Sequence, residues 1–402
     1  MKRVGPGFLV MAAFIGPGTV ITASKAGAQF GFTLMWALLF SVLATLVLQE
    51  MAARLGLVTG RGLAEALRSG FKNRFFRLLA IALVVLAIGF GNAAYESGNI
   101  SGASMGLSAI TPYPTNLWAL VVGGIAFAIL ASGRYRVVER GLIALVVVMS
   151  CVFIFTMLMV GPDPGEMLRG LLRPSLPEGS TLTVLALIGT TVVPYNLFLH
   201  SSSVREKWPE ATPVDSALQE SRRDSLISIS LGGLITLAIM TTAAAAFFGG
   251  DTTFSAATIS QQLEPLLGPA AKYFFAVGLL AAGLTSAITS PLAAAYAVAG
   301  ALGWEADLAS SRFRLVWALV LGSGIVAAAL GTRPINAIMF AQAANGFLLP
   351  LLAVYLLYVM NSAPLLGEHR NRWPSNIIGG LVVLVVSGLG VFKLTQVFGL
   401  DG

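Results

Sequence analysis

The sequence predicts an all-α membrane protein with eleven spanning helices, arranged as two inverted five-helix repeats and one extra helix. Three observations lead to this prediction. The 402-residue chain is 56% hydrophobic and 11% charged, whereas a soluble protein carries about 25% charged residues. Its apolar residues fall into runs long enough to cross a bilayer. Two of these runs, five spans apart, are interrupted by Gly and Pro.

About 20 apolar residues suffice for one spanning helix, and the chain contains eleven such runs in succession. The predicted spans are 7–29, 33–54, 78–107, 116–132, 139–161, 180–203, 225–249, 268–302, 314–331, 336–361 and 374–397. The third and eighth runs are long, so we expect tilted helices there. The longest polar stretch, about 204–224, is expected to be a connection that holds a short surface helix. No segment suits a separate soluble domain, so 1–402 is predicted to be one transmembrane domain.

Lys and Arg residues gather in alternate loops. The segment between the second and third spans is rich in both, whereas the loop at 250–253 (GDTT) has none. By the positive-inside rule the N-terminus is cytoplasmic and the C-terminus outside, in a multi-pass protein of the plasma membrane. The net charge of +7 therefore reflects membrane orientation, and we expect no nucleic-acid partner. The basic residues 1–3 (MKR) flank the first span, which continues beyond the length of a cleaved signal peptide.

The first span contains Gly16, Pro17 and Gly18 in its middle, followed by Thr19. Gly and Pro disfavour a continuous helix, because Gly is flexible and Pro lacks an N–H. A break inside a bilayer leaves free backbone groups, which are tolerated where they line a cavity or are buried in protein. Between Gly16 and Lys25 there is no Asp, Glu, His, Cys or Met. The segment therefore predicts a backbone-lined site without metal ligands.

A second interruption lies in the sixth span, at residues 189–196 (GTTVVPYN). Interrupted helices at matching positions in two halves indicate an inverted-repeat transporter with its site between them. The repeats would cover about 4–161 and 180–361, with the extra helix at about 374–397. The alternative interpretation is two proline kinks of purely structural value.

Four segments resemble a known family. They are residues 5–9 (GPGFL), 27–31 (GAQFG), 48–61 (LQEMAARLGLVTGR) and 196–202 (NLFLHSS). They are similar to segments of the NRAMP (natural resistance-associated macrophage protein) divalent-metal transporters, and the resemblance covers nearly the whole chain. It implies a LeuT-like fold with helices 1 and 6 unwound at mid-membrane, and transport by alternating access.

The chain departs from that family at both breaks. NRAMP metal carriers have Asp-Pro-Gly-Asn at the first break, where this chain reads GPGT at 16–19. They have Met-Pro-His at the second, where it reads VPY at 193–195. The carboxylate, the amide and the soft thioether that favours transition metals are therefore absent. Of three acidic positions that the family links to proton movement, two correspond to Gly89 and Asn99, and one keeps an acid, Glu96.

We predict that the site between the breaks takes a small inorganic anion, with bicarbonate as the first candidate. The second halves of helices 1 and 6 would direct their N-termini, which carry free N–H groups and partial positive charge, at the site. Glycine would let an oxyanion approach the backbone closely. The candidate substrate-binding residues are Gly16, Pro17, Gly18, Thr19, Lys25, Val193, Tyr195, Asn196 and Gln342. Three of these residues have alternative roles. Lys25 could pair with Glu96 or extend to the membrane surface, Tyr195 could be a packing aromatic with its hydroxyl on a backbone carbonyl, and Gln342 could bridge helices.

Two further sets of residues are candidates for coupling to an ion gradient. Thr285, Ser286 and Thr289, with Ser290 beside them, offer hydroxyls for a sodium site, although such hydroxyls also join membrane helices. Glu96 and His200 are candidates for a proton relay, since both can titrate near neutral pH in a suitable setting. A hydrogen-bonded packing role for His200 is the alternative.

Other functions remain as alternatives. A magnesium-like divalent cation that keeps its water would need fewer charged ligands, and a receptor on a transporter scaffold would carry nothing. No nucleophile–base pair points to an enzyme, and no cofactor or resident metal is predicted. The lipid bilayer is the expected partner, and the oligomeric state is left open. The single cysteine, Cys151, cannot form an intrachain disulfide and is expected to be buried.

Overall fold

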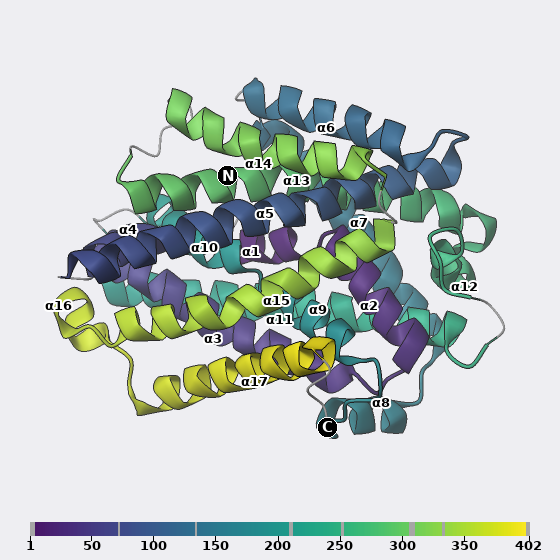
Figure 1. Ribbon diagram of the computed structural model, residues 1–402. Helices are drawn as coiled ribbons and strands as arrows, with labels where there is room; N and C mark the ends of the chain where they lie inside the picture. The colour runs from purple at the N-terminus through teal and green to yellow at the C-terminus, as the bar shows by residue number, and fades with distance from the viewer. Residues whose placement is uncertain are drawn as a thin grey trace.

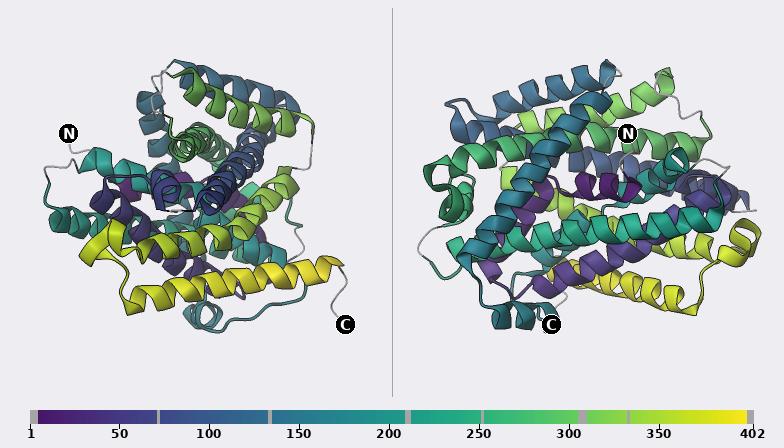
Figure 2. Two further views of the ribbon diagram at one scale, coloured as in Figure 1. Left: turned by 60° about the vertical axis from the view of Figure 1, so that its left-hand side comes forward. Right: turned by 180° about the vertical axis from the view of Figure 1, so that it is seen from behind.

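The computed structural model describes residues 5–70, 73–132, 135–208, 212–250, 253–304, 310–331 and 334–398. Within these ranges every regular element is a helix. The helices form a bundle in which α6 and α14 lie together at one side and α17 at the opposite side (Figure 1). Seen from behind, α7 crosses the bundle obliquely (Figure 2).

The first half of the chain forms the helices of the predicted first repeat, with a short helix after it. They are α1 (Pro6–Phe14), α2 (Pro17–Phe30), α3 (Met35–Thr59), α4 (Leu63–Gly70), α5 (Arg74–Ile110), α6 (Thr115–Ala131), α7 (Tyr135–Val160) and α8 (Pro164–Leu172). Asp163 begins α8, because its carboxylate accepts the backbone N–H groups of Gly165 and Glu166. Gly60 ends α3 in the left-handed conformation, with φ of 62°.

The second half contains the remaining helices. They are α9 (Thr181–Thr191), α10 (Pro194–Lys207), α11 (Val214–Phe247), η1 (Ile259–Leu263), α12 (Glu264–Leu267), η2 (Gly268–Ala270), α13 (Ala271–Leu302), α14 (Ser311–Ala329), α15 (Pro334–Met360), α16 (Ala363–Leu366), η3 (Gly367–His369) and α17 (Trp373–Phe398).

The helices confirm a membrane protein of the all-α class. In the described part of the chain, seven helices are long and apolar enough to cross a membrane. The number rises to ten if each of three bent helix pairs is one span. Thr115–Ala131 is a further, shorter apolar helix. The number of eleven spans, the membrane orientation and the division into two repeats remain predictions.

Two details of the sequence analysis were wrong. The connection expected at 204–224 is largely helical, because α10 continues to Lys207 and α11 already begins at Val214. Pro213 and the acidic Asp215 favour a helix start at that point. The second correction concerns Cys151, which is exposed on α7 rather than buried.

Both predicted breaks interrupt the helices. The first break, Ile15 and Gly16, separates α1 from α2, which are bent by 57° relative to each other. The second break, Val192 and Val193, separates α9 from α10. Each second half begins with a proline, which fits there because the first N–H of a helix has no intrahelical partner. The depth of the breaks in a bilayer remains a prediction.

Long-range contacts hold the broken helices in the bundle. The start of α1 is tied to α11, because the N–H of Gly7 donates to Asp224 Oδ2 at 2.7 Å. The negative carboxylate is also favourable at the positive end of α1. Helix α2 packs against α11, α9 and α15, and its first ten residues from Pro17 to Ala26 are buried except for Lys25, which is half-buried.

Candidate functional site

Side chains of α2 and α10 donate hydrogen bonds to backbone carbonyls near the end of α1. The Thr19 hydroxyl donates to the carbonyl of Phe14. The Tyr195 hydroxyl donates to the carbonyl of Ala13 at 3.3 Å, and the Asn196 amide reaches that of Val10 at 3.5 Å. The last four carbonyls of a helix lack intrahelical partners. At this break, part of that need is met by protein donors.

The two breaks meet directly. Thr19 Oγ1 lies 2.8 Å from Thr190 Oγ1, which belongs to the last turn of α9. Both hydroxyls are fully buried. This contact joins segments 171 residues apart in the sequence, so the first and second breaks form a single site.

The starts of α2 and α10 leave backbone amides for a ligand. In α2 the first intrahelical donor at this end is Val20, which bonds the carbonyl of Gly16 at 3.1 Å. The preceding amides of Gly18 and Thr19 have no carbonyl of their own helix to bond. The amide of Tyr195 has the same position in α10. Two helix N-termini, whose first N–H groups have no partner in their own helix and which carry partial positive charge, therefore belong to the site.

Two other helices close on the first break. A Cβ atom at Gly18 would stand 2.1 Å from Nε2 of Gln342 on α15. A Cβ at Gly16 would stand 2.7 Å from Oγ of Ser286 on α13. A Cβ at either position would displace one of these side chains, so glycine lets the side chains of α13 and α15 lie directly against the backbone of the break.

Several buried polar atoms around the breaks lack a partner within the described part of the chain. They are Oε1 of Gln342, Oγ of Ser286 and Oδ1 of Asn196. Buried polar groups are normally hydrogen-bonded, so unmet ones mark places where a ligand or water fits. Thr19, Tyr195, Asn196 and Gln342 are each at most 1% exposed. The site is therefore closed, and an ion can reach it only after a rearrangement.

The remaining candidate residues are only partly brought together. Val193 is the buried residue immediately before α10. Lys25 lies further along α2, half-buried, and in the described residues it makes no ion pair with Glu96. Glu96 is fully buried and accepts a hydrogen bond from the Asn99 amide at 3.1 Å. His200 lies 3.0 Å from the side chain of Gln49 on α3, one helical turn past Asn196.

Tyr95 links the Glu96 segment to the site, and the sequence analysis did not single it out. Its ring packs edge-on against the ring of Tyr195, with centroids 5.4 Å apart. Both rings are fully buried. The sequence marks Tyr95 only as the neighbour of Glu96 in the third span. That position does not reveal a ring contact with Tyr195, which lies 100 residues further along the chain.

The candidate sodium residues differ in their surroundings, and a sodium site there remains a prediction. The hydroxyls of Thr285 and Thr289 donate to carbonyls of their own helix, at 2.8 and 2.7 Å, which leaves their oxygen lone pairs as acceptors. Ser286 instead faces Gly16 across the first break. In the described residues no group of three or more His, Cys, Asp or Glu is placed to hold a metal ion.

Replacing Thr19 by Val should lower the free energy of unfolding by about 1–3 kcal/mol, because the buried carbonyl of Phe14 loses its donor. Val keeps the shape, so packing is little changed. The matched control is Thr156→Val, whose buried hydroxyl donates only to its own helix, to Val152. Thermal unfolding of the purified protein in detergent measures both. Equal midpoints for the two variants would contradict the role given to Thr19.

A closed polar site between two interrupted helices is the arrangement that secondary transporters use for their substrate. This chain belongs to the Nramp family: the model of the family "Natural resistance-associated macrophage protein-like" matches residues 7–396. The resemblance noted in the sequence is thereby confirmed.

Curated relatives match over nearly their whole length. The chain is 28% identical to the divalent metal cation transporter MntH of Verminephrobacter eiseniae, covering 99% of this chain and 90% of the relative. It is also 28% identical to MntH of Klebsiella pneumoniae, covering 100% and 96%.

Solved structures agree on the fold. A mutant of the Eremococcus coleocola manganese transporter superposes with a TM-score of 0.78 at 22% identity, covering 100% of this chain and 88% of that one. Mhp1, a nucleobase-cation-symport-1 family transporter, gives a TM-score of 0.57 at 15% identity, covering 98% and 94%. These likenesses establish a LeuT-like transporter fold.

Proposed function

We propose that this Nramp-family transporter carries a small anion, with bicarbonate as the first candidate, through the closed site between the two breaks. One observation carries the proposal. Three carbonyl oxygens of α1 near the first break already accept hydrogen bonds from Thr19, Tyr195 and Asn196, which leaves fewer of them for a cation. The amides at the starts of α2 and α10 have no such partner in their own helices.

The charge of the site supports the same proposal. A dehydrated divalent cation needs compensation by negative ligands, because the cost of removing it from water is very large. Gly16 stands where the resembled metal carriers have Asp, and Thr19 replaces their Asn. Without a carboxylate, the partial charges left at the breaks are those of helix ends. The N-termini of α2 and α10 favour a negative guest, while carbonyls of α1, whose C-terminus lies opposite, are in part already hydrogen-bonded.

A divalent cation is the second candidate, and the relatives favour it over an anion. Those described above are named divalent metal cation transporters, and the first solved structure is a manganese transporter. Magnesium gives up its water reluctantly and is often bound through that water. The unpartnered oxygens of Gln342, Ser286 and Asn196 could accept hydrogen bonds from such a hydration shell.

Coupling to protons or sodium is part of the proposal. Glu96 is a buried carboxyl and follows Tyr95 directly in the chain. The ring of Tyr95 packs against the ring of Tyr195 in the site. Ser286 is the hydroxyl that faces the first break. We assign a proton relay to Glu96 and His200, and a sodium contact to Ser286, as the candidates for supplying uphill drive.

Uptake into proteoliposomes distinguishes the candidates. We expect bicarbonate-dependent anion flux, read as current on supported membranes and as accumulation of labelled bicarbonate, above that of empty liposomes, which account for diffusion of carbon dioxide. Magnesium and manganese uptake should stay at the level of empty liposomes. Each ion is tested with and without imposed sodium and proton gradients.

Metal uptake without anion flux would establish the second candidate and overturn the first. Specific binding of either ion without flux of any kind, in reconstituted protein of confirmed integrity, would instead indicate a receptor.

A further inference from the structure

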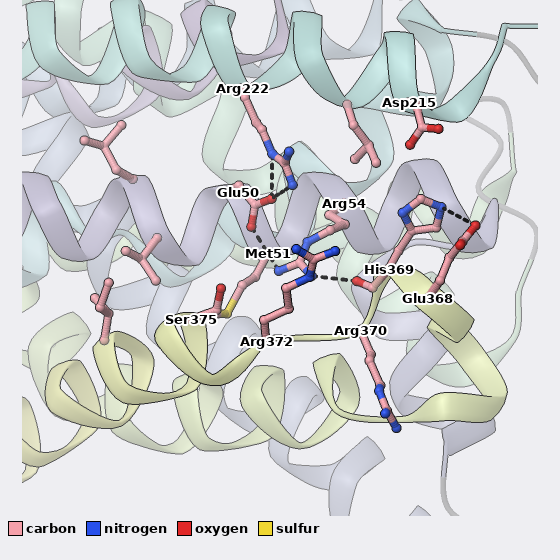
Figure 3. Close-up of a pocket in the computed structure, with 14 residues that line it drawn as sticks. Glu50, Met51, Arg54, Asp215, Arg222, Glu368, His369, Arg370, Arg372 and Ser375 are labelled. Atoms are coloured by element: carbon pink, nitrogen blue, oxygen red, sulfur yellow. Dashed lines mark hydrogen bonds and ion pairs between the residues drawn. The ribbon is translucent and has the colours of Figure 1, made fainter.

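A cavity of about 670 Å³ lies away from the breaks, between α3, α11 and the segment that leads into α17 (Figure 3). Four arginines line it: Arg54, Arg222, Arg370 and Arg372. Three carboxylates line it as well: Glu50, Asp215 and Glu368. None of its lining residues belongs to the site described above, so it is a separate feature of the fold.

Part of this cavity is a rigid ion-pair network. Glu50 accepts two hydrogen bonds from Arg222, at 2.9 and 3.0 Å, and one from Arg54 at 3.0 Å (Figure 3). Arg54 is 6% exposed and also donates to the carbonyl of His369 at 2.6 Å and to Asn371 at 2.7 Å. The negative charge of Glu50 is thus compensated twice, and Arg54 fixes the 369–371 segment against α3.

Other charges of the cavity are free. In the described residues the side chains of Arg370 and Arg372 form no ion pair or hydrogen bond, and both are exposed. Of the two remaining carboxylates, Glu368 lies 3.9 Å from the imidazole of His369 (Figure 3), and Asp215 lies in the first turn of α11, where the helix dipole favours it. Arg370 and Arg372 extend in different directions (Figure 3). A free guanidinium group at a cavity mouth is suited to a phosphate, which it can bind with paired hydrogen bonds.

The cavity continues into an apolar surface. Its wall includes Leu46 and Val47 of α3 and Ile378 of α17. Further from the arginines, at helical spacing on the same two helices, Leu43 and Leu381 are 52% and 54% exposed. In spanning helices such exposed apolar residues face hydrocarbon, so a charged cavity and a lipid-facing stripe are continuous.

We propose that this cavity binds the phosphate headgroup of an anionic phospholipid, whose acyl chain lies along the stripe of α3 and α17. Arg54 lies near the end of α3, Arg222 near the start of α11 and Arg370 in the segment before α17. The positive-inside rule places these basic ends of the spans on the cytoplasmic side, where the leaflet is rich in anionic lipid. A free phosphate would satisfy the arginines but would leave the apolar wall unused. The bound lipid would join α3 and α11 to α17.

The test compares lipid binding by variants of the full chain. Purified protein in neutral detergent is titrated with phosphatidylglycerol, phosphatidylcholine, glycerol phosphate or inorganic phosphate. Native mass spectrometry and thermal unfolding report binding. We expect phosphatidylglycerol to bind and stabilise the wild type, and the Arg370→Gln, Arg372→Gln double variant to need about tenfold more of it. Because both arginines are exposed, the variant should unfold at the wild-type temperature in detergent alone.

The matched control removes two basic charges that do not line the cavity, Arg61→Gln with Arg312→Gln. Retained lipid affinity in this control supports a specific cavity. An equal loss of affinity for phosphatidylglycerol in both double variants would show that only the overall charge matters, and it would overturn the proposal. Stabilisation by glycerol phosphate or inorganic phosphate equal to that by the lipid would also overturn it, since the acyl chain would then play no part.

Discussion

The Gly16→Asp variant is expected to lose anion transport by about a thousandfold. The new carboxylate would sit in the first break, beside the amides of Gly18 and Thr19. Two unit charges about 4 Å apart repel by about 4 kcal/mol at an effective dielectric constant of about 20, and each 1.4 kcal/mol is a factor of ten. The measurement is bicarbonate-dependent flux in proteoliposomes.

Gly16→Asn is the control, because it has nearly the same volume and no charge. Both side chains must displace the Ser286 hydroxyl, which a Cβ at position 16 would approach to 2.7 Å. An Asn variant that retains much more flux than the Asp variant shows that charge, not size, stops the anion. Unchanged anion flux in Gly16→Asp would show that this break is not the anion site. If the second candidate is correct, the Asp variant should instead strengthen divalent-cation uptake.

The Gly27→Ala variant is expected to destabilise the fold by about 1–3 kcal/mol or more, as overpacking does in other cores. A Cβ there would stand 2.0 Å from the carbonyl oxygen of Met240 and 2.9 Å from the amide of Ala244. Both are backbone atoms of α11, so relief requires that whole helices move apart. The thermal midpoint in detergent and the yield of monodisperse protein measure the effect.

Gly124→Ala on α6 is the matched change, because among the described residues its Cβ would meet no atom within 4 Å beyond the backbone of its own helix. Ala is the better helix former by about 1 kcal/mol, so this variant should be at least as stable as the wild type. A midpoint for Gly27→Ala equal to that of Gly124→Ala would contradict the close packing of α2 on α11.

The site was predicted only in part. Thr19, Tyr195, Asn196 and Gln342 were expected around the breaks, and the structure brings them together there. They were expected to contact the substrate, but Thr19, Tyr195 and Asn196 donate to carbonyls of α1. For Tyr195, a hydroxyl bonded to a backbone carbonyl was the alternative taken from the sequence. Sequence spacing cannot reveal such pairings, because they join residues on different helices.

Other residues show the same limit. Lys25 and Glu96 are opposite charges in apolar spans, yet they form no ion pair in the described structure. Thr285 and Thr289 share a segment with Ser286, but only Ser286 faces Gly16, because their hydroxyls bond within α13. Which face of a helix meets a neighbour depends on packing, and the periodicity of an almost wholly apolar span does not disclose it.

By itself the sequence determined the membrane class, the helical fold and the two places where helices break. These follow from local causes: apolar runs of bilayer length, and prolines at positions 17 and 194 that cannot continue a helix. Only the tertiary structure decided which groups at the breaks stay unpaired and how arginines of α3, of α11 and of the segment before α17 form one cavity. Both depend on contacts between residues more than a hundred positions apart, and these arise only when the helices pack.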